Sequence, residues 1–156
     1  SKVTNAEDME AAVAEAFLHD KQVVIEENID GFEVGCAIMG NVELTVGRVD
    51  EIALSEGFFD YEEKYTLKSS QIHMPARISL EEEARIKETA KKIYRTLGCK
   101  GFCRVDMFYT SSKEIVFNEV NTIPGFTSHS RFPNMMKGIG MDFKELVNQI
   151  IALAEV

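Results

Sequence analysis

The sequence lacks a long apolar segment, a cysteine framework and an excess of positive charge. No apolar run approaches the ~20 residues that span a bilayer, and no signal-peptide pattern opens the chain. Lys and Arg number 17 against 26 Asp and Glu, a net charge of −9, which excludes a basic surface for nucleic acid. Cys36, Cys99 and Cys103 are odd in number and lack metal-ligand spacing, which favours reduced thiols. We expect a soluble cytoplasmic protein with neither nucleic acid nor membrane as partner.

The residues that are present suffice for a folded core. The chain has 156 residues, 45% of them hydrophobic, which fits one domain or a large piece of a multidomain protein. Helical spacing predicts a helix over 6–19 that packs on a sheet. Apolar runs predict a strand over 23–27 and a hairpin of strands 32–39 and 42–52. No period persists from 53 to 74, so a long loop is expected there.

Two further helices carry clear end signals. Ser79 and Glu82 form the capping-box pattern that opens a helix, and Gly98 closes it. Asp142 and Glu145 cap a last helix that runs to about residue 154. In the helix that opens at Ser79, the residues that we expect to point inward are Ile86, Ala90, Ile93, Tyr94 and Leu97. Together these elements predict an α+β fold, an antiparallel sheet flanked by helices.

A pair of strands bearing carboxylates follows the Ser79 helix. Strand 102–108 carries Arg104 and Asp106, and strand 115–121 carries Glu119 and Asn121. Side chains two apart on a strand share a face, and a two-residue turn of Ser111 and Ser112 would place all four on one face of a hairpin. Carboxylate and amide oxygens are ligands that Mg²⁺ prefers, and a guanidinium suits phosphate. The pattern indicates a divalent-cation site.

Three other interpretations of this hairpin stay open on the residues alone. The polar face could be solvated, although the opposite face of both strands is apolar. Arg104 could form a salt bridge with Glu119, its expected cross-strand neighbour. The acidic cluster could also be a structural Ca²⁺ site.

The remaining polar candidates have ordinary explanations when each is taken alone. Glutamates at a strand end, here Glu26, Glu27 and Glu33, are mostly exposed to solvent. Lys64 and Tyr65 fit equally a lysine that extends along apolar surface and a packed tyrosine.

Several short strings in this chain occur in one order. They begin at residues 25, 31, 61, 98, 118 and 127 and read IEE, GFE, YEEKY, GCKGFCRVD, NEVNTIPG and TSHS. Together they resemble the D-alanine:D-alanine ligase family of ATP-grasp enzymes, over essentially the whole chain and in the family's order. Residues 1–3 resemble the segment just after that family's glycine-rich phosphate loop. The resemblance implies that residues 1–156 are the C-terminal half of an ATP-grasp ligase, without its N-terminal domain and phosphate loop.

By position, the resemblance implies roles for the hairpin residues. Asp106, Glu119 and Asn121 would bind two Mg²⁺ ions that bridge the nucleotide phosphates, with Mn²⁺ as a substitute. Arg104 would stabilise the negative charge that develops during transfer and addition.

The resemblance also implies a nucleotide site and a closing loop. Tyr65 would lie in the loop that closes over the substrates, and Ser130 would hold the carboxylate of the second amino acid. Glu26 would contact the adenine amine, and the backbone near Glu27 and Ile29 would contact the other edge of the base. Glu33 would bind the ribose hydroxyls, Phe58 would stack near the base, and Lys64 would contact the phosphates.

The reaction implied is ATP-dependent joining of D-amino acids, in which D-alanine is activated as an acyl phosphate and the amine of a second amino acid displaces phosphate. One departure concerns the second substrate. D-alanine:D-alanine enzymes usually place leucine after this serine, whereas the chain has Arg131, whose donors suit a substrate hydroxyl. This resembles the vancomycin-resistance D-alanine:D-serine ligases, and the retained Lys64 and Tyr65 argue against the D-lactate-forming relatives.

We therefore expect an ATP-dependent D-alanine:D-serine ligase that supplies cell-wall precursors. Two alternatives remain: a D-alanine:D-alanine ligase in which Arg131 turns outward, and a non-catalytic module that binds nucleotide and Mg²⁺. The partners implied are small D-amino acids, the N-terminal part of the same ligase and a second copy in a homodimer.

Overall fold

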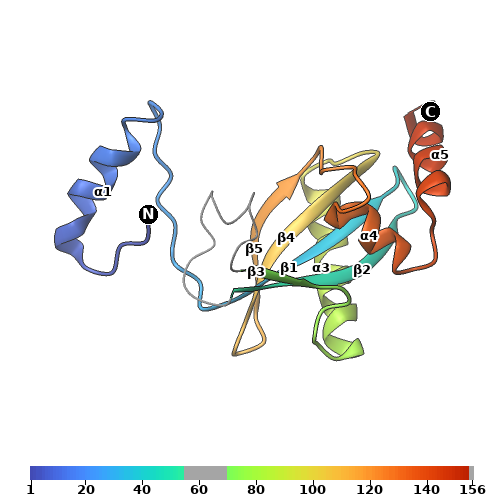
Figure 1. Cartoon of the computed structure of the whole chain (residues 1–156), viewed down its shortest axis with the longest axis horizontal. Coiled ribbons are helices and arrows are strands. Elements are labelled where there is room, and N and C mark those ends of the chain that lie inside the picture. Colours follow the sequence, from blue (N-terminus) through green and yellow to red (C-terminus); the bar gives the residue numbers. More distant parts are fainter. Residues whose placement is uncertain (55–69, 155–156) are drawn as a thin grey trace.

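A computed structural model describes residues 1–54 and 70–154 of the chain (Figure 1). The strands are β1 (Gly31–Met39), β2 (Thr45–Leu54), β3 (Ser70–His73), β4 (Phe102–Thr110) and β5 (Ile115–Asn121). The helices are η1 (Ala6–Asp8), α1 (Met9–Ala16), α3 (Leu80–Thr96), α4 (Arg131–Lys137) and α5 (Phe143–Ala154).

The described strands form one antiparallel sheet in the order β3-β2-β1-β4-β5. Strand β1 pairs with both β2 and β4, so the two predicted hairpins lie side by side in one layer. The hairpin is confirmed, but β2 begins at Thr45 rather than at residue 42, so the turn is longer than the predicted Gly40-Asn41. Gly40 has a φ of 136°, a conformation that suits glycine. Strand β3 was not predicted, because its four residues are too few to show a period.

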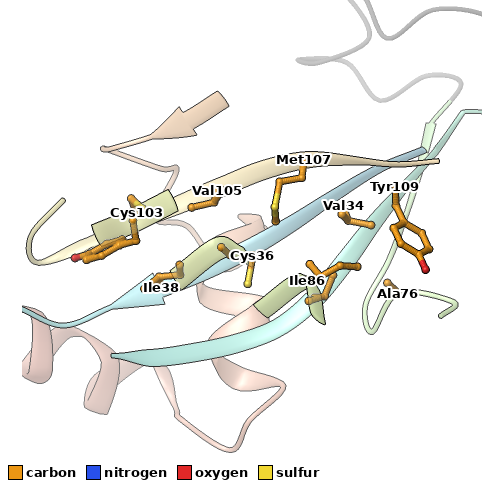
Figure 2. Close-up of a cluster of buried hydrophobic side chains, with 12 residues drawn as sticks. Val34, Cys36, Ile38, Ala76, Ile86, Cys103, Val105, Met107 and Tyr109 are labelled. Carbon is orange, nitrogen blue, oxygen red and sulfur yellow. The ribbon is translucent and has the colours of Figure 1, made fainter. Parts of the chain in front are cut away.

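One face of the sheet packs against α3. The capping box is confirmed: Ser79 accepts a hydrogen bond from the Glu82 backbone, and Glu82 accepts one from the Ser79 backbone. Leu97 was predicted to point inward, but it is 55% exposed because it lies beyond the last helical turn. Figure 2 shows the buried side chains of this face, which include Val34, Cys36, Ile38, Ile86, Val105 and Met107.

The opposite face packs against α4 and α5. Ala37 and Met39 of β1 meet Phe132, Met135 and Met136 of α4 in a second buried cluster. Because α4 begins at Arg131 and its next residues are buried against β1 and β2, the start of this helix is fixed over the middle of the sheet.

Two predictions for the first thirty residues are wrong. The helix forms only over η1 and α1, and no residue of either is buried, so it does not pack on the sheet (Figure 1). Residues 23–27 form no strand, and Val24 and Ile25 are 79% and 66% exposed. The physical reason is common to both segments: an apolar pattern forms packed structure only where a partner surface meets it, and none of the described elements does.

The three cysteines are free, and burial raises the pKa of Cys103 to about 12, which fits the expected reduced thiols. Among the helices of the described ranges, none combines the length and the apolar character needed to cross a bilayer.

Candidate functional site

The carboxylate hairpin is formed by β4 and β5, next to the centre of the sheet. Asp106 pairs directly with Glu119 across the strands, and Arg104 pairs with Asn121. All four side chains therefore lie on one face of the sheet, as predicted, and it is the face covered by α4. Asp106 and Arg104 are 1% and 8% exposed. The proposal of a fully solvated polar face is therefore wrong for these two residues.

The predicted register of this hairpin is wrong by two residues at Arg104. The Thr110 N–H donates to the Glu114 carbonyl, and the Glu114 N–H donates to the Thr110 hydroxyl, so the turn has three residues, and Lys113 takes a φ of 65°. A further register shift follows Asp106, where two residues of β5 oppose one of β4. Such bulges re-aim side chains near functional sites. Arg104 is consequently placed opposite Asn121 rather than Glu119.

Arg104 donates to the carboxylate of Asp106 from two nitrogens. Nε lies 2.8 Å from Oδ1 and 2.9 Å from Oδ2, and a terminal nitrogen lies 2.7 Å from Oδ2. A bidentate pair of this kind fixes both side chains in one geometry. The sequence placed these residues on one face but did not indicate this pairing.

The donor set on the hairpin fits a hard divalent cation. Asp106 and Glu119 are cross-strand neighbours, whose Cβ atoms lie about 5 Å apart in such pairs, and Asn121 adds an amide oxygen on the same face. Within residues 1–54 and 70–154, no three His, Cys, Asp or Glu side chains converge as a metal-binding group. A cation here would therefore take two carboxylates, an amide and further oxygens from a ligand, which is the usual arrangement for Mg²⁺ beside phosphates.

Arg131 extends from the first residue of α4 onto the sheet, where three carboxylates surround it. Nε and one terminal nitrogen donate to the two oxygens of Asp50 at 2.8 and 2.7 Å, and the other terminal nitrogen donates to Glu33 Oε1 at 3.0 Å. Asp106 Oδ1 lies 3.6 Å away. The Arg131 side chain is 11% exposed, so it does not turn outward. A guanidinium has five N–H groups, and two of them have no hydrogen-bond acceptor among the described residues.

Burial and charge oppose each other in this cluster. Burial disfavours the charge of Arg131, but Asp50 and then Asp106 and Glu33 outweigh it and raise the pKa of the guanidinium. Burial raises the pKa of Glu33 above its usual value, although Arg131 partly offsets that rise. Arg131 is therefore held charged, and it is the cation that keeps Glu33 and Asp50 tolerable in a buried position.

Asp50 is the residue of this cluster that the sequence pattern missed. It lies on β2, is 1% exposed, and its Oδ1 also accepts from the backbone N–H of Gly35 at 3.1 Å. A charged residue needs a partner once it is buried. Asp50 stands in a strand that also carries Arg48 and Glu51, so the sequence pattern did not single it out, and its partner, Arg131, lies 81 positions away.

Ser130 lies directly before α4, in a loop that follows β5. Its hydroxyl accepts from the backbone N–H of Thr127 at 2.9 Å and shares a hydrogen bond with the Thr127 hydroxyl at 2.9 Å. It is therefore oriented by its own loop and makes no cap of α4. The structure brings Ser130 beside Arg131, at the same end of the helix.

Of the residues predicted to hold the nucleotide, only some lie near the hairpin and Arg131 or within the described part of the chain. Glu33 joins the Arg131 cluster, whereas Glu26 and Glu27 are exposed and Ile29 is partly buried, in a segment without regular structure before β1. Phe58, Lys64 and Tyr65 lie outside the described residues.

The sheet face thus carries a carboxylate pair, a bidentate arginine and a second, largely buried arginine at a helix start. Residues 1–152 match the family model described as D-ala D-ala ligase C-terminus. The chain belongs to the D-alanine:D-alanine ligase family. The described fold agrees with the C-terminal ATP-grasp region of these ligases, so the predicted fold class is confirmed.

Three relatives of this ligase family illustrate the match. The vancomycin C-type resistance protein VanC2 of Enterococcus casseliflavus is 47% identical over 99% of the chain and 44% of its own length. The crystal structure of VanG D-Ala:D-Ser ligase from Enterococcus faecalis is 65% identical, with a TM-score of 0.89 over 98% of the chain and 45% of its own. The D-alanine-D-alanine ligase from Coxiella burnetii is 28% identical, with a TM-score of 0.84, over 99% of the chain and 40% of its own. The chain thus spans less than half the length of each.

Proposed function

We propose that this chain is the nucleotide- and metal-binding half of an ATP-dependent ligase that joins D-alanine to D-serine through a D-alanyl phosphate, for peptidoglycan precursors and vancomycin resistance. The observation that carries the proposal is the position of Arg131, buried and charged between Asp50 and Glu33 beside the carboxylate hairpin. Two similarities support it: to VanG, a D-Ala:D-Ser ligase, and to VanC2, a vancomycin C-type resistance protein.

Asp106, Glu119 and Asn121 would hold Mg²⁺, two ions by the family resemblance, with Mn²⁺ as a substitute. The bound metal neutralises phosphate charge and so lowers the barrier to phosphoryl transfer. Arg104 is fixed by Asp106 at 2.7 to 2.9 Å, and a preorganised cation of this kind stabilises the negative charge that develops on the reacting oxygens.

The second amino acid would be selected at the start of α4. The Ser130 hydroxyl would bind its carboxylate, and the two Arg131 N–H groups without a described acceptor would donate to the serine hydroxyl. Since Asp50 and Glu33 fix the guanidinium, a substrate without a hydroxyl would leave those donors unpaired. Sites of this kind reject the analogue that lacks the hydroxyl.

A D-alanine:D-alanine ligase is the second candidate, and one observation favours it. Three N–H groups of Arg131 are already satisfied by Asp50 and Glu33, so the residue has a structural task independent of substrate. The Coxiella burnetii neighbour is titled as a D-alanine-D-alanine ligase. A non-catalytic module is disfavoured, because it would have no need of the full set Arg104, Asp106, Glu119 and Asn121.

The remaining parts of the proposal rest on the family. The nucleotide would be held by Glu26, Glu27, Ile29, Glu33, Phe58 and Lys64, and Tyr65 would belong to the closing loop. The N-terminal part of the same ligase would complete the site, a second copy would form a homodimer, and the enzyme would work in the cytoplasm.

The test is phosphate release and product identity with the complete protein. We would supply ATP, Mg²⁺ and D-alanine, with and without D-serine, and identify the dipeptide by mass. Predominant D-alanyl-D-serine supports the proposal. Predominant D-alanyl-D-alanine would replace it with the second candidate, and ATP binding without product would leave only a binding module.

A further inference from the structure

Gly35 lies under the guanidinium of Arg131, at the centre of the buried charge cluster. It is buried in β1, and in the sheet it is paired with Asp50 of β2 on one side and Asp106 of β4 on the other. Its own N–H donates to Asp50 Oδ1 at 3.1 Å, and that same oxygen accepts from Arg131 at 2.7 Å. Gly35 is therefore the position on the sheet face where the guanidinium and its main carboxylate partner meet.

A side chain at this position would occupy the space that the guanidinium fills. A Cβ built on Gly35 would overlap a terminal nitrogen of Arg131, and it would lie 2.6 Å from Asp50 Oδ1 and 2.9 Å from Met135 Cε. Nothing in the described backbone demands glycine here, because the only positive φ values in β1 and the turn that follows belong to Gly40. The need for glycine at position 35 is a need for space above the strand.

We infer that Gly35 makes the room in which Arg131 lies and is thereby a positioning residue for the choice of the second substrate. The first half of this inference stands on the contacts of Gly35, and the second half rests on the proposed function. The three atoms nearest to such a Cβ are all ends of side chains. The fold can therefore accept alanine by moving them, and the guanidinium, with the closest approach, is the group that must move.

The matched control is Gly47. The three atoms nearest to a Cβ on Gly47 all belong to Met135 of helix α4, in its backbone and its Cβ, each at 3.0 Å. Gly47→Ala therefore presses on the helix, whereas Gly35→Ala presses on the guanidinium. A loss of selectivity that came only from a disturbed helix would appear in both variants.

The experiment compares the complete enzyme with its Gly35→Ala and Gly47→Ala variants, with D-alanine and D-serine in competition. We expect Gly35→Ala to lower the ratio of D-alanyl-D-serine to D-alanyl-D-alanine about tenfold or more, the size expected for losing one hydrogen bond to a charged donor, and Gly47→Ala to leave the ratio within about twofold. A folded Gly35→Ala enzyme with an unchanged ratio would overturn the inference, as would an equal loss in both variants.

A second measurement tests the space itself and needs no activity. Arg131→Lys keeps the positive charge but removes the terminal nitrogen that the Cβ would meet. Gly35→Ala should lower the thermal midpoint by several degrees in the parent and by much less in the Arg131→Lys background. If Gly35→Ala alone does not fold, the double variant should, and a double variant that stays unfolded contradicts the inference. If the parent enzyme makes no D-alanyl-D-serine, the proposed function fails, and this thermal cycle still decides the role of Gly35.

Discussion

Arg131→Met should destabilise the protein far more than the loss of an exposed arginine. The substitution leaves Asp50 with the Gly35 N–H as its described hydrogen-bond donor and Glu33 with only the weaker charge effect of Arg104, whereas Asp106 keeps its bonds to Arg104. Removing one partner of a buried ion pair costs about 3–5 kcal/mol. With an m-value of about 2–3 kcal/mol per M in urea, the midpoint should fall by at least about 1 M.

Lowering the pH should reverse part of the stability lost in Arg131→Met, and Glu33 determines the direction of this pH dependence. Burial already raises its pKa, and Arg131 is the group that holds the rise in check. Without Arg131 the folded-state pKa rises further above the unfolded value, so the folded state binds a proton more readily as the pH falls. The deficit of Arg131→Met should therefore shrink between pH 7 and pH 5.

The assay is urea unfolding of the complete protein at both pH values, with Arg77→Met as control. Arg77 pairs with Glu51, but its side chain is 60% exposed although that of Glu51 is 5% exposed, so solvent screens the pair and its loss should cost less than that of Arg131. Burial tends to raise the pKa of Glu51, but its bonds to Arg77 lower it. Removing Arg77 removes that effect, so the smaller deficit of this variant should also narrow as the pH falls. A loss for Arg131→Met as small as the control, or one that does not change with pH, would refute the reasoning.

Four further outcomes are expected. Glu119→Gln should abolish ATP-dependent phosphate release while leaving the circular dichroism spectrum unchanged; an undiminished rate would defeat the metal assignment. Ser79→Ala should lower the free energy of unfolding by about 1 kcal/mol. The Ser79 backbone N–H first, then other partners, lower the pKa of Glu82 to about 2, so the stability lost in Glu82→Gln should decrease as the pH falls from 4.5 toward 2. A stability loss independent of pH would speak against this. Glu33→Gln should raise KM for ATP and also lower the preference for D-serine, because Glu33 accepts from Arg131; kinetics in which neither changes would contradict this link.

Sequence reasoning succeeded where the signal is local. The capping box of Ser79, the glycine at position 98 and the apolar face of β4 each depend on residues within a few positions, and the structure confirms them. The common face of Arg104, Asp106, Glu119 and Asn121 was also predicted correctly. Side chains alternate between faces along a strand, so a register error of an even number of residues leaves them on the same face. The error here is two residues at Arg104.

The register and the charge cluster could not be read from the sequence for different reasons. Lys113 takes a left-handed conformation usually signalled by glycine or asparagine, so the three-residue turn had no marker. The ion pair of Asp50 with Arg131 forms only when α4 packs across β1 and β2. For the helix over 6–16 the sequence predicted the local structure correctly but not the packing, since no described surface packs against it.

The proposed selection of D-serine by Arg131, which Asp50 and Glu33 hold in place, can be measured in one competition experiment. The complete enzyme and its Arg131→Leu variant would receive ATP, Mg²⁺ and an equimolar mixture of D-alanine and D-serine, and the two dipeptides would be quantified by mass. The account predicts mainly D-alanyl-D-serine from the parent and a shift of at least tenfold toward D-alanyl-D-alanine in the variant. An active variant with the parent's product ratio would contradict it.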